Sequence, residues 1–223
     1  IKTSDQYGVE IKNILSLFEV PVETVEDVII SSVVPPVFNA VRTGAYKVTG
    51  LTPMVVGPGI KTGLNIQMDN PASVGSDLIV AAVAALQEYT APLMLIDMGT
   101  ATTITVVDQG NNYIGGAIIP GVRVSAEALS SRAAQLPGIQ LDRPKRAIGK
   151  NTIECMRSGI MYGAAAMLDG MVERMEAELG KPVTVVATGG IAQFIVPLCK
   201  REMTIEKDLL LKGLNVIYKK NKK

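Results

Sequence analysis

Residues 93–118 read LMLIDMGTATTITVVDQGNNYIGGAI, and this stretch decides the fold. Its β-branched and apolar runs at 93–97, 102–107 and 113–118 predict strands. Tight-turn sequences separate them, first Asp97-Met98-Gly99-Thr100 and then Gln109-Gly110-Asn111-Asn112. The stretch therefore predicts a three-stranded meander.

The rest of the chain alternates short β-branched runs with longer amphipathic or small-residue stretches, which predicts an α/β protein. Further strands are predicted at 28–34, 54–56 and 183–187. Helices are predicted at 9–18, 37–49, 77–88, 125–135, 152–179, 191–198 and 209–219.

Two lobes are predicted, 1–90 and 91–223, because Pro71 and Pro92 flank the helix at 77–88 and mark a boundary near residue 90. The first lobe has no Asp-x-Gly meander, and the chain opens on Ile1. We therefore expect about thirty further residues of natural N-terminus, the size that an ordinary α/β half-domain would need.

Composition excludes several classes of function. Hydrophobic residues make up 48% and charged residues 19%, which is typical of a globular protein. The formal net charge of +1 gives no reason to expect a nucleic acid or an anionic membrane as partner. No histidine is present, so catalysis that depends on histidine is excluded.

The cytoplasm is the expected location. The longest apolar run, 78–86, is far shorter than the roughly 20 residues of a membrane helix, and no signal segment opens the chain. Cys155 and Cys199 lie far apart and outside any CxxC spacing, so we expect two free, buried thiols in a reducing compartment.

The segment from Asp97 to Thr103 suits phosphoryl transfer. A carboxylate at the end of a strand offers an oxygen ligand to a cation, while Gly99 and Thr100 offer backbone and hydroxyl donors to phosphate oxygens. The alternative is an ordinary hairpin turn, in which the threonines only raise the β-propensity.

A second glycine turn follows the predicted strand at 183–187. Gly189 and Gly190 would let the backbone approach a nucleotide closely, and the N-terminus of the next helix would favour an anion. The alternative is again an ordinary strand-to-helix turn.

Seven further motifs occur in order along almost the whole chain: 57–64 (GPGIKTGL), 70–71 (NP), 75–77 (GSD), 113–121 (YIGGAIIPG), 131–137 (SRAAQLP), 149–152 (GKNT) and 211–214 (LKGL). Together with the Asp97 and Gly189 turns, they resemble the type III pantothenate kinase family. The resemblance implies a duplicated ribonuclease-H-like fold of the actin/hexokinase type of ATPase.

The resemblance also implies an activity, the ATP-dependent phosphorylation of pantothenate to 4'-phosphopantothenate at the start of coenzyme A biosynthesis. Mg²⁺, a monovalent cation (K⁺ or NH₄⁺) and a homodimer come with it. The implied site residues are Asp77 as the base, Gly75 and Ser76 with the substrate, Thr152 reaching pantothenate across the dimer, Gly99, Thr100, Gly189 and Gly190 with ATP, and Asp97 with the monovalent cation.

Three features depart from the family pattern. Leu78 stands where the family's Gly-x-Asp-Arg has arginine, Met68 stands where a tyrosine is common, and no N-terminal Asp-x-Gly-Asn-Thr loop is present. Leucine cannot pair with a carboxylate ligand, so pantothenate should be poorly matched. A non-catalytic paralogue with a regulatory role is therefore the alternative, and a sugar or acetate kinase of the same superfamily is a more distant one.

The helix at 152–179 carries a stripe of small residues, Gly159, Gly163, Ala166 and Gly170, at spacings of three and four. Such a stripe would allow close packing of two helices in a homodimer. The alternative is that it packs against the chain's own sheet.

Overall fold

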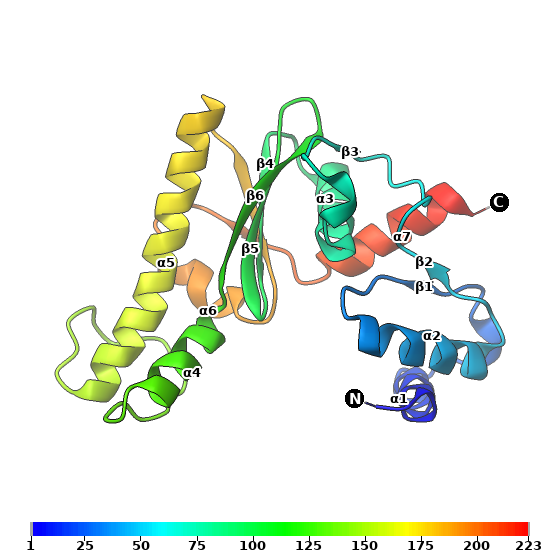
Figure 1. Cartoon of the computed structure of the whole chain (residues 1–223), viewed down its shortest axis with the longest axis horizontal. Coiled ribbons are helices and arrows are strands. Elements are labelled where there is room, and N and C mark those ends of the chain that lie inside the picture. The colour runs from blue at the N-terminus through cyan, green and yellow to red at the C-terminus, as the bar shows by residue number, and fades with distance from the viewer. Residues whose placement is uncertain (1, 223) are drawn as a thin grey trace. The chain divides into compact units, whose positions relative to one another are not determined.

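A computed structural model describes residues 2–222 and divides them into two compact units. The first contains the chain up to Gly63, Asn70–Ala84 and the residues from Leu210 on. The second contains Leu64–Asp69 and Ala85–Leu209. Each unit is described separately below, with the elements labelled as in Figure 1.

The first unit is mainly helical around a small parallel sheet. Its strands pair Ile29 with Met54 and Ile30 with Val55. Its elements are α1 (Ser4–Leu17), a 3-10 helix (Val22–Thr24), β1 (Ile29–Ile30), α2 (Pro35–Thr49), β2 (Met54–Val55), a second 3-10 helix (Pro71–Ser73), the start of α3 (Ser76–Glu88) and most of α7 (Leu209–Asn221).

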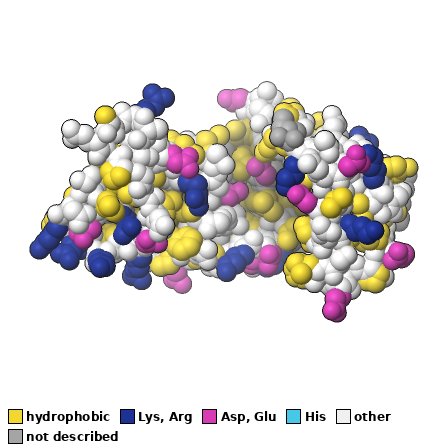
Figure 2. All heavy atoms as spheres, turned by 90° about the horizontal axis from the view of Figure 1, so that it is seen from below, with side chains coloured by type: hydrophobic (Ala, Val, Ile, Leu, Met, Phe, Trp, Pro, Cys, Tyr) yellow, Lys and Arg dark blue, Asp and Glu magenta, His cyan; other side chains and the backbone are white. Residues whose placement is uncertain are grey.

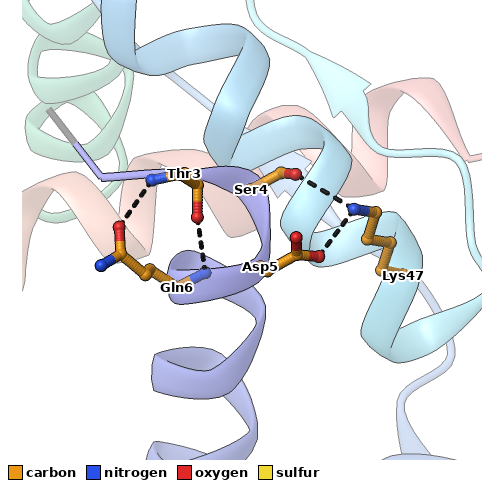
Figure 3. Close-up of polar contacts among 5 residues, drawn as sticks. All are labelled: Thr3, Ser4, Asp5, Gln6 and Lys47. Carbon is orange, nitrogen blue, oxygen red and sulfur yellow. Dashed lines mark hydrogen bonds and ion pairs between the residues drawn. The ribbon is translucent and has the colours of Figure 1, made fainter.

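A capping box fixes the start of α1 (Figure 3). Gln6 N donates to Thr3 Oγ1 at 3.3 Å, and Thr3 N donates to Gln6 Oε1 at 2.8 Å. Lys47 of α2 then reaches Ser4 Oγ at 3.1 Å and Asp5 Oδ1 at 2.7 Å. An N-cap of this kind stabilises a helix by about 1 kcal/mol, and the lysine ties that end of α1 to α2.

The second unit is built on a six-stranded sheet in the order β3-β6-β5-β4-β7-β8. Neighbouring strands β4, β5 and β6 are antiparallel, so the predicted meander is confirmed, and the other pairs are parallel. Its elements are β3 (Asn65–Ile66), the end of α3, β4 (Leu93–Met98), β5 (Ala101–Val107), β6 (Asn112–Pro120), α4 (Val122–Arg132), α5 (Thr152–Leu179), β7 (Thr184–Thr188), α6 (Ala192–Ile195), a 3-10 helix (Val196–Leu198) and β8 (Thr204–Ile205).

The core of the second unit lies between the sheet and α5, which runs along one face of it in Figure 1. Met94 and Ile96 of β4 are fully buried there against Met161 and Leu168 of α5. Alternate residues of a strand share a face, so these side chains form one layer. The buried face of α5 is therefore the one that carries Met161 and Leu168.

Three differences from the predicted elements occur in the second unit, and the first two have simple causes. The strands β3 and β8 were not predicted, because two residues are too few to show a periodic pattern. The helix predicted at 191–198 ends as α-helix at Ile195 and continues as a 3-10 helix, since Pro197 has no N–H to donate. The third is α4, which begins at Val122, directly after Gly121, earlier than predicted.

Neither cysteine forms a disulfide. Cys199 is half-buried, and burial raises the pKa of its thiol to about 12. Cys155 is exposed, so the expectation of two buried thiols is wrong for this residue, which lies on the outer side of α5. Separately, none of the helices formed within residues 2–222 is both long and apolar enough to cross a membrane.

The orientation of α5 can be tested by truncating one leucine in its buried face. Leu168→Ala should lower the free energy of unfolding by about 3 kcal/mol, because Leu168 is fully buried and the change leaves a cavity. Leu211→Ala on α7 is the matched control, since Leu211 is 67% exposed and should change stability by less than about 0.5 kcal/mol. Urea unfolding of both variants measures the difference, and equal losses would contradict this orientation of α5.

Candidate active site

The two predicted phosphate motifs lie at one edge of the sheet of the second unit. Strands β4 and β7 are parallel neighbours, and their register pairs Asp97 with Thr188. The carboxyl ends of the two strands therefore coincide, and the Gly99 and Gly189 turns that follow them leave the sheet together. The sequence predicted the two turns separately, and the strand register brings them together.

The turn between β4 and β5 also holds the start of α4. Gly99 N donates to Ala101 O at 3.0 Å, which closes the turn, and Gly121 N donates to Thr100 O at 3.1 Å. Gly121 is the N-cap of α4 and makes no side-chain capping bond. The first turn of a helix offers N–H groups without intrahelical partners, so α4 adds anion-binding donors beside Thr100.

Sequence reasoning did not assign this helix terminus to the site. The only local signal was Pro120-Gly121, where the predicted strand had to stop. Its place next to the Gly99 turn depends on the backbone bond between Gly121 and Thr100, two residues far apart along the chain.

Gly189 is required by the structure. Its φ is +95°, a left-handed value that favours glycine, and a Cβ there would lie 2.6 Å from Met98 O. A Cβ on Gly190 would have no atom within 4 Å, so open space lies beside that backbone. The helix that follows has only four residues in α6, so the predicted anion-favouring dipole is weak here and α4 is the better donor.

The residues at this edge fit phosphate oxygens and a cation. Within residues 2–222, the buried hydroxyls of Thr102 and Thr103 have no hydrogen-bond partner, and Thr103 is the cross-strand partner of Asp97. Unsatisfied buried hydroxyls are often explained by a water or ligand. No group of three or more His, Cys, Asp or Glu side chains could hold a metal there or elsewhere in the described chain, so a cation at Asp97 would need further oxygen ligands, such as backbone carbonyls, water or phosphate.

Three of the residues predicted to contact the phosphoryl acceptor, Gly75, Ser76 and Asp77, belong to the first unit and lie at the start of α3. Asp77 Oδ1 accepts a hydrogen bond from Leu78 N at 2.9 Å, which orients the carboxylate. Ser76 and Ser31 share a hydrogen bond of 2.8 Å between their hydroxyls. This arrangement suits both a base and a simple cap of the helix. Leu78 is half-buried directly after Asp77.

Thr152 and Met68 belong to the second unit. Thr152 is the first residue of α5 and is exposed, while the cap of that helix is Asn151, whose side chain accepts from Glu154 N. Thr152 is therefore not needed for capping. Met68 follows β3, and its sulfur lies 3.4 Å from the position of a Cβ on Gly115 of β6.

Comparison with known proteins agrees with these motifs. The sequence pattern of the family described as type III pantothenate kinase matches residues 1–174. A type III pantothenate kinase of an Exiguobacterium species is 46% identical over 222 residues, which is 100% of this chain and 87% of that protein. The Bacillus cytotoxicus type III pantothenate kinase is 44% identical over 220 residues, covering 99% and 84% of the two chains.

A solved structure supports the fold alone. The Campylobacter jejuni protein described as a conserved Baf family transcriptional activator superposes with a TM-score of 0.60 at 18% identity, over 93% of this chain and 88% of that one. The sequence matches extend over nearly the whole chain and include the stretches that build the edge of the sheet. On this basis the chain belongs to the type III pantothenate kinase family.

Proposed function

We propose that this chain catalyses the ATP-dependent phosphorylation of pantothenate to 4'-phosphopantothenate, the first step of coenzyme A biosynthesis. The observation that carries the proposal is the register of Asp97 with Thr188, which gathers the nucleotide motifs of the family at one edge. The two unpaired cysteines suit a reducing compartment, so we place the reaction in the cytoplasm.

On the nucleotide side, the chain would position the phosphates of ATP and neutralise their charge. The Thr100 hydroxyl and the first amides of α4 would donate to phosphate oxygens. Gly99 and Gly189 would shape the two turns beside them, and the open space at Gly190 would leave room for the nucleotide. The Asp97 carboxylate would hold a monovalent cation, K⁺ or NH₄⁺. Mg²⁺ bound with ATP would supply further charge neutralisation.

On the acceptor side, Asp77 would take the proton from the attacking hydroxyl of pantothenate. Because Oδ1 is held by Leu78 N, the proton would pass to Oδ2. Gly75 and Ser76 precede the base and would line the acceptor site. Most of the rate would come from positioning, as phosphoryl transfer generally requires.

A homodimer would bring Thr152 of one protomer to the acceptor site of the other. The small-residue stripe of α5 supports such an assembly, since Gly159, Gly163 and Ala166 are exposed while the opposite face packs on the sheet. A Cβ on Gly159 or Gly163 would have no atom within 4 Å. The stripe is therefore open to another helix.

One observation favours a second candidate, a non-catalytic paralogue that keeps the fold and has a regulatory role. The residue directly after Asp77 is Leu78, which lacks the positive charge that would pair with the carboxylate of pantothenate. The decisive experiment is phosphorylation of pantothenate by ATP with the full-length protein, measured with potassium present and absent, and failure in both conditions would favour the paralogue.

Replacing the proposed cation ligand should impair the use of ATP. We expect Asp97→Asn to lower the turnover of ATP by about a hundredfold, because a neutral amide binds the cation less well and the phosphate charge is then less neutralised. Asp108→Asn is the control, since Asp108 likewise lies where a strand meets a hairpin turn but accepts from Gly110 N and Asn112 N within its own hairpin. Steady-state assays with a thermal melt of each variant separate chemistry from folding. Unchanged turnover in Asp97→Asn would assign Asp97 to the turn alone.

The Michaelis constant for pantothenate should respond to the charge at position 78. We expect Leu78→Arg to improve kcat/KM for pantothenate by about ten- to a hundredfold, the worth of one charge-assisted hydrogen bond. The double variant Leu78→Arg/Met68→Tyr measures whether a tyrosine at position 68 adds to this gain. Leu78→Gln is the control, because it adds polarity without charge and should bring no such gain. Efficient use of pantothenate by the unchanged protein would show that another cation serves its carboxylate.

The dimer can be tested through the stripe. The protein should sediment as a dimer at micromolar concentration, and Gly163→Trp should shift it toward the monomer, because a large side chain prevents close approach of two helices. Asn13→Trp on the exposed side of α1 is the control and should leave the dimer intact. A monomer in the unchanged protein would remove the proposed role of Thr152.

A further inference from the structure

The segment between α4 and α5, residues 133–151, has no regular structure but is firmly attached to the first turns of α5. Ser158 Oγ donates to Ala147 O at 2.5 Å, and Arg157 Nε donates to Gln140 O at 3.2 Å. Near its end, a Cβ on Gly149 would overlap the backbone of α5 at Cys155. The loop therefore forms a fixed surface on this helix.

A small cavity lies between this loop and α5. Its volume is about 90 Å³, and it is lined by Pro144, Lys145, Arg146, Glu154 and Arg157. Because a water molecule occupies about 30 Å³ in the liquid, the cavity has room for a group of a few heavy atoms. Figure 2, which views the chain from below, shows Lys and Arg side chains gathered at the end where α4 and α5 lie.

The lining is strongly positive. Three cations and one carboxylate give a net charge of +2. Arg157 is held in place by its bond to Gln140 O and by Asp142 at the rim, 3.4 Å away, and its side chain is only 25% exposed. Lys145 and Arg146 make no hydrogen bond or close ion pair with any other residue of the described chain. Two donors are thus left for a ligand.

The positive charges at the cavity affect the pKa of Glu154, the one carboxylate that lines it. The Lys150 N–H donates to Glu154 Oε2 at 3.0 Å and lowers the pKa of that carboxyl group. The positive charges of Arg146 and Lys145 lower it further. These side chains therefore favour negative charge at the cavity, and the single carboxylate of Glu154 neutralises only part of their positive charge.

We propose that this cavity binds the phosphate group of a small molecule. A phosphate monoester carries a charge of about −1.5 to −2 at neutral pH, which balances the net charge of the lining. Its oxygens accept hydrogen bonds from Lys145, Arg146 and Arg157, and such charge-assisted bonds to phosphate are the strong ones in proteins. The site shares no residue with the edge that carries Asp97 and Thr100.

Binding there has a consequence for the end of the loop. The segment that supplies Lys145 and Arg146 runs directly into Gly149–Thr152, and Glu154 bonds to Lys150 N. A phosphate bridging the loop and Arg157 stiffens this segment in its folded position. Binding at the cavity therefore acts on the segment that leads into α5.

Inorganic phosphate is the first probe. Its binding to the intact chain is measured through the chemical shifts of backbone amides and by calorimetry, at constant ionic strength. We expect saturable binding in about the millimolar range, with shifts centred on Lys150 and Glu154. The double variant Lys145→Gln/Arg146→Gln should weaken it at least about tenfold. The control Lys12→Gln/Lys219→Gln removes the same charge from exposed positions of the first unit and should leave the affinity unchanged.

A substitution of opposite sign sharpens the test. Glu154→Gln keeps an oxygen for the Lys150 N–H and removes the negative charge, so it should tighten phosphate binding by about threefold or more, while Glu173→Gln on the same helix should not. Methyl phosphate is the second probe. Tighter binding of the ester than of inorganic phosphate would assign the cavity to an organic phosphate, and the reverse order to the free ion.

Three results would overturn the proposal. They are the absence of saturable binding, equal losses in the two double variants, and shifts confined to the Gly99 and Gly189 turns. None of these measurements needs ATP turnover, so they stand apart from the success or failure of the kinase assay.

Discussion

The second unit depends on the position of β4 between β5 and β7. Leu93, Met94 and Ile96 are fully buried, so the strand is covered on both faces and paired along both edges. Its apolar run ends at Asp97, the half-buried residue that lies opposite Thr103 on one side and Thr188 on the other. A slip of one residue would move every side chain of β4 to the other face, so core packing fixes the register and with it the nucleotide edge.

Much of this could be predicted from the sequence, because the decisive segments are long or sharply bounded. The meander and the limits of α5 were predicted from periodicity and turn residues and are confirmed. Family membership confirms the duplicated ribonuclease-H-like fold class. The pairing of Asp97 with Thr188 could not be predicted, since the register of parallel strands far apart along the chain has no local signal. The same holds for Gly121 beside Thr100 and for the unsatisfied hydroxyls of Thr102 and Thr103.

The proposed nucleotide and acceptor sites differ in the groups that would recognise charge. At the edge of β4, the proposed donors to phosphate come largely from the backbone, namely the first amides of α4. Such donors survive most side-chain substitutions. The carboxylate of an acceptor needs a cationic side chain, and a single change at position 78 removes one. A chain of this family can therefore keep its nucleotide edge while its acceptor site changes, and for this reason Leu78 bears on the substrate more than on the fold.

The second unit thus has two environments that suit anions. They differ in how much side-chain freedom is lost when an anion binds and in how strongly salt weakens the binding. Backbone amides at the start of α4 are already ordered by the helix, so binding there orders nothing new. In the cavity beside α5, Arg157 is already held by Gln140, but Lys145 and Arg146 lose side-chain freedom when they close on a ligand. That loss weakens binding, and salt screens the long-range attraction of exposed cations. An edge built from amides suits a reaction that must hold ATP in one geometry, whereas a cavity lined by exposed Lys145 and Arg146 suits a ligand that binds reversibly.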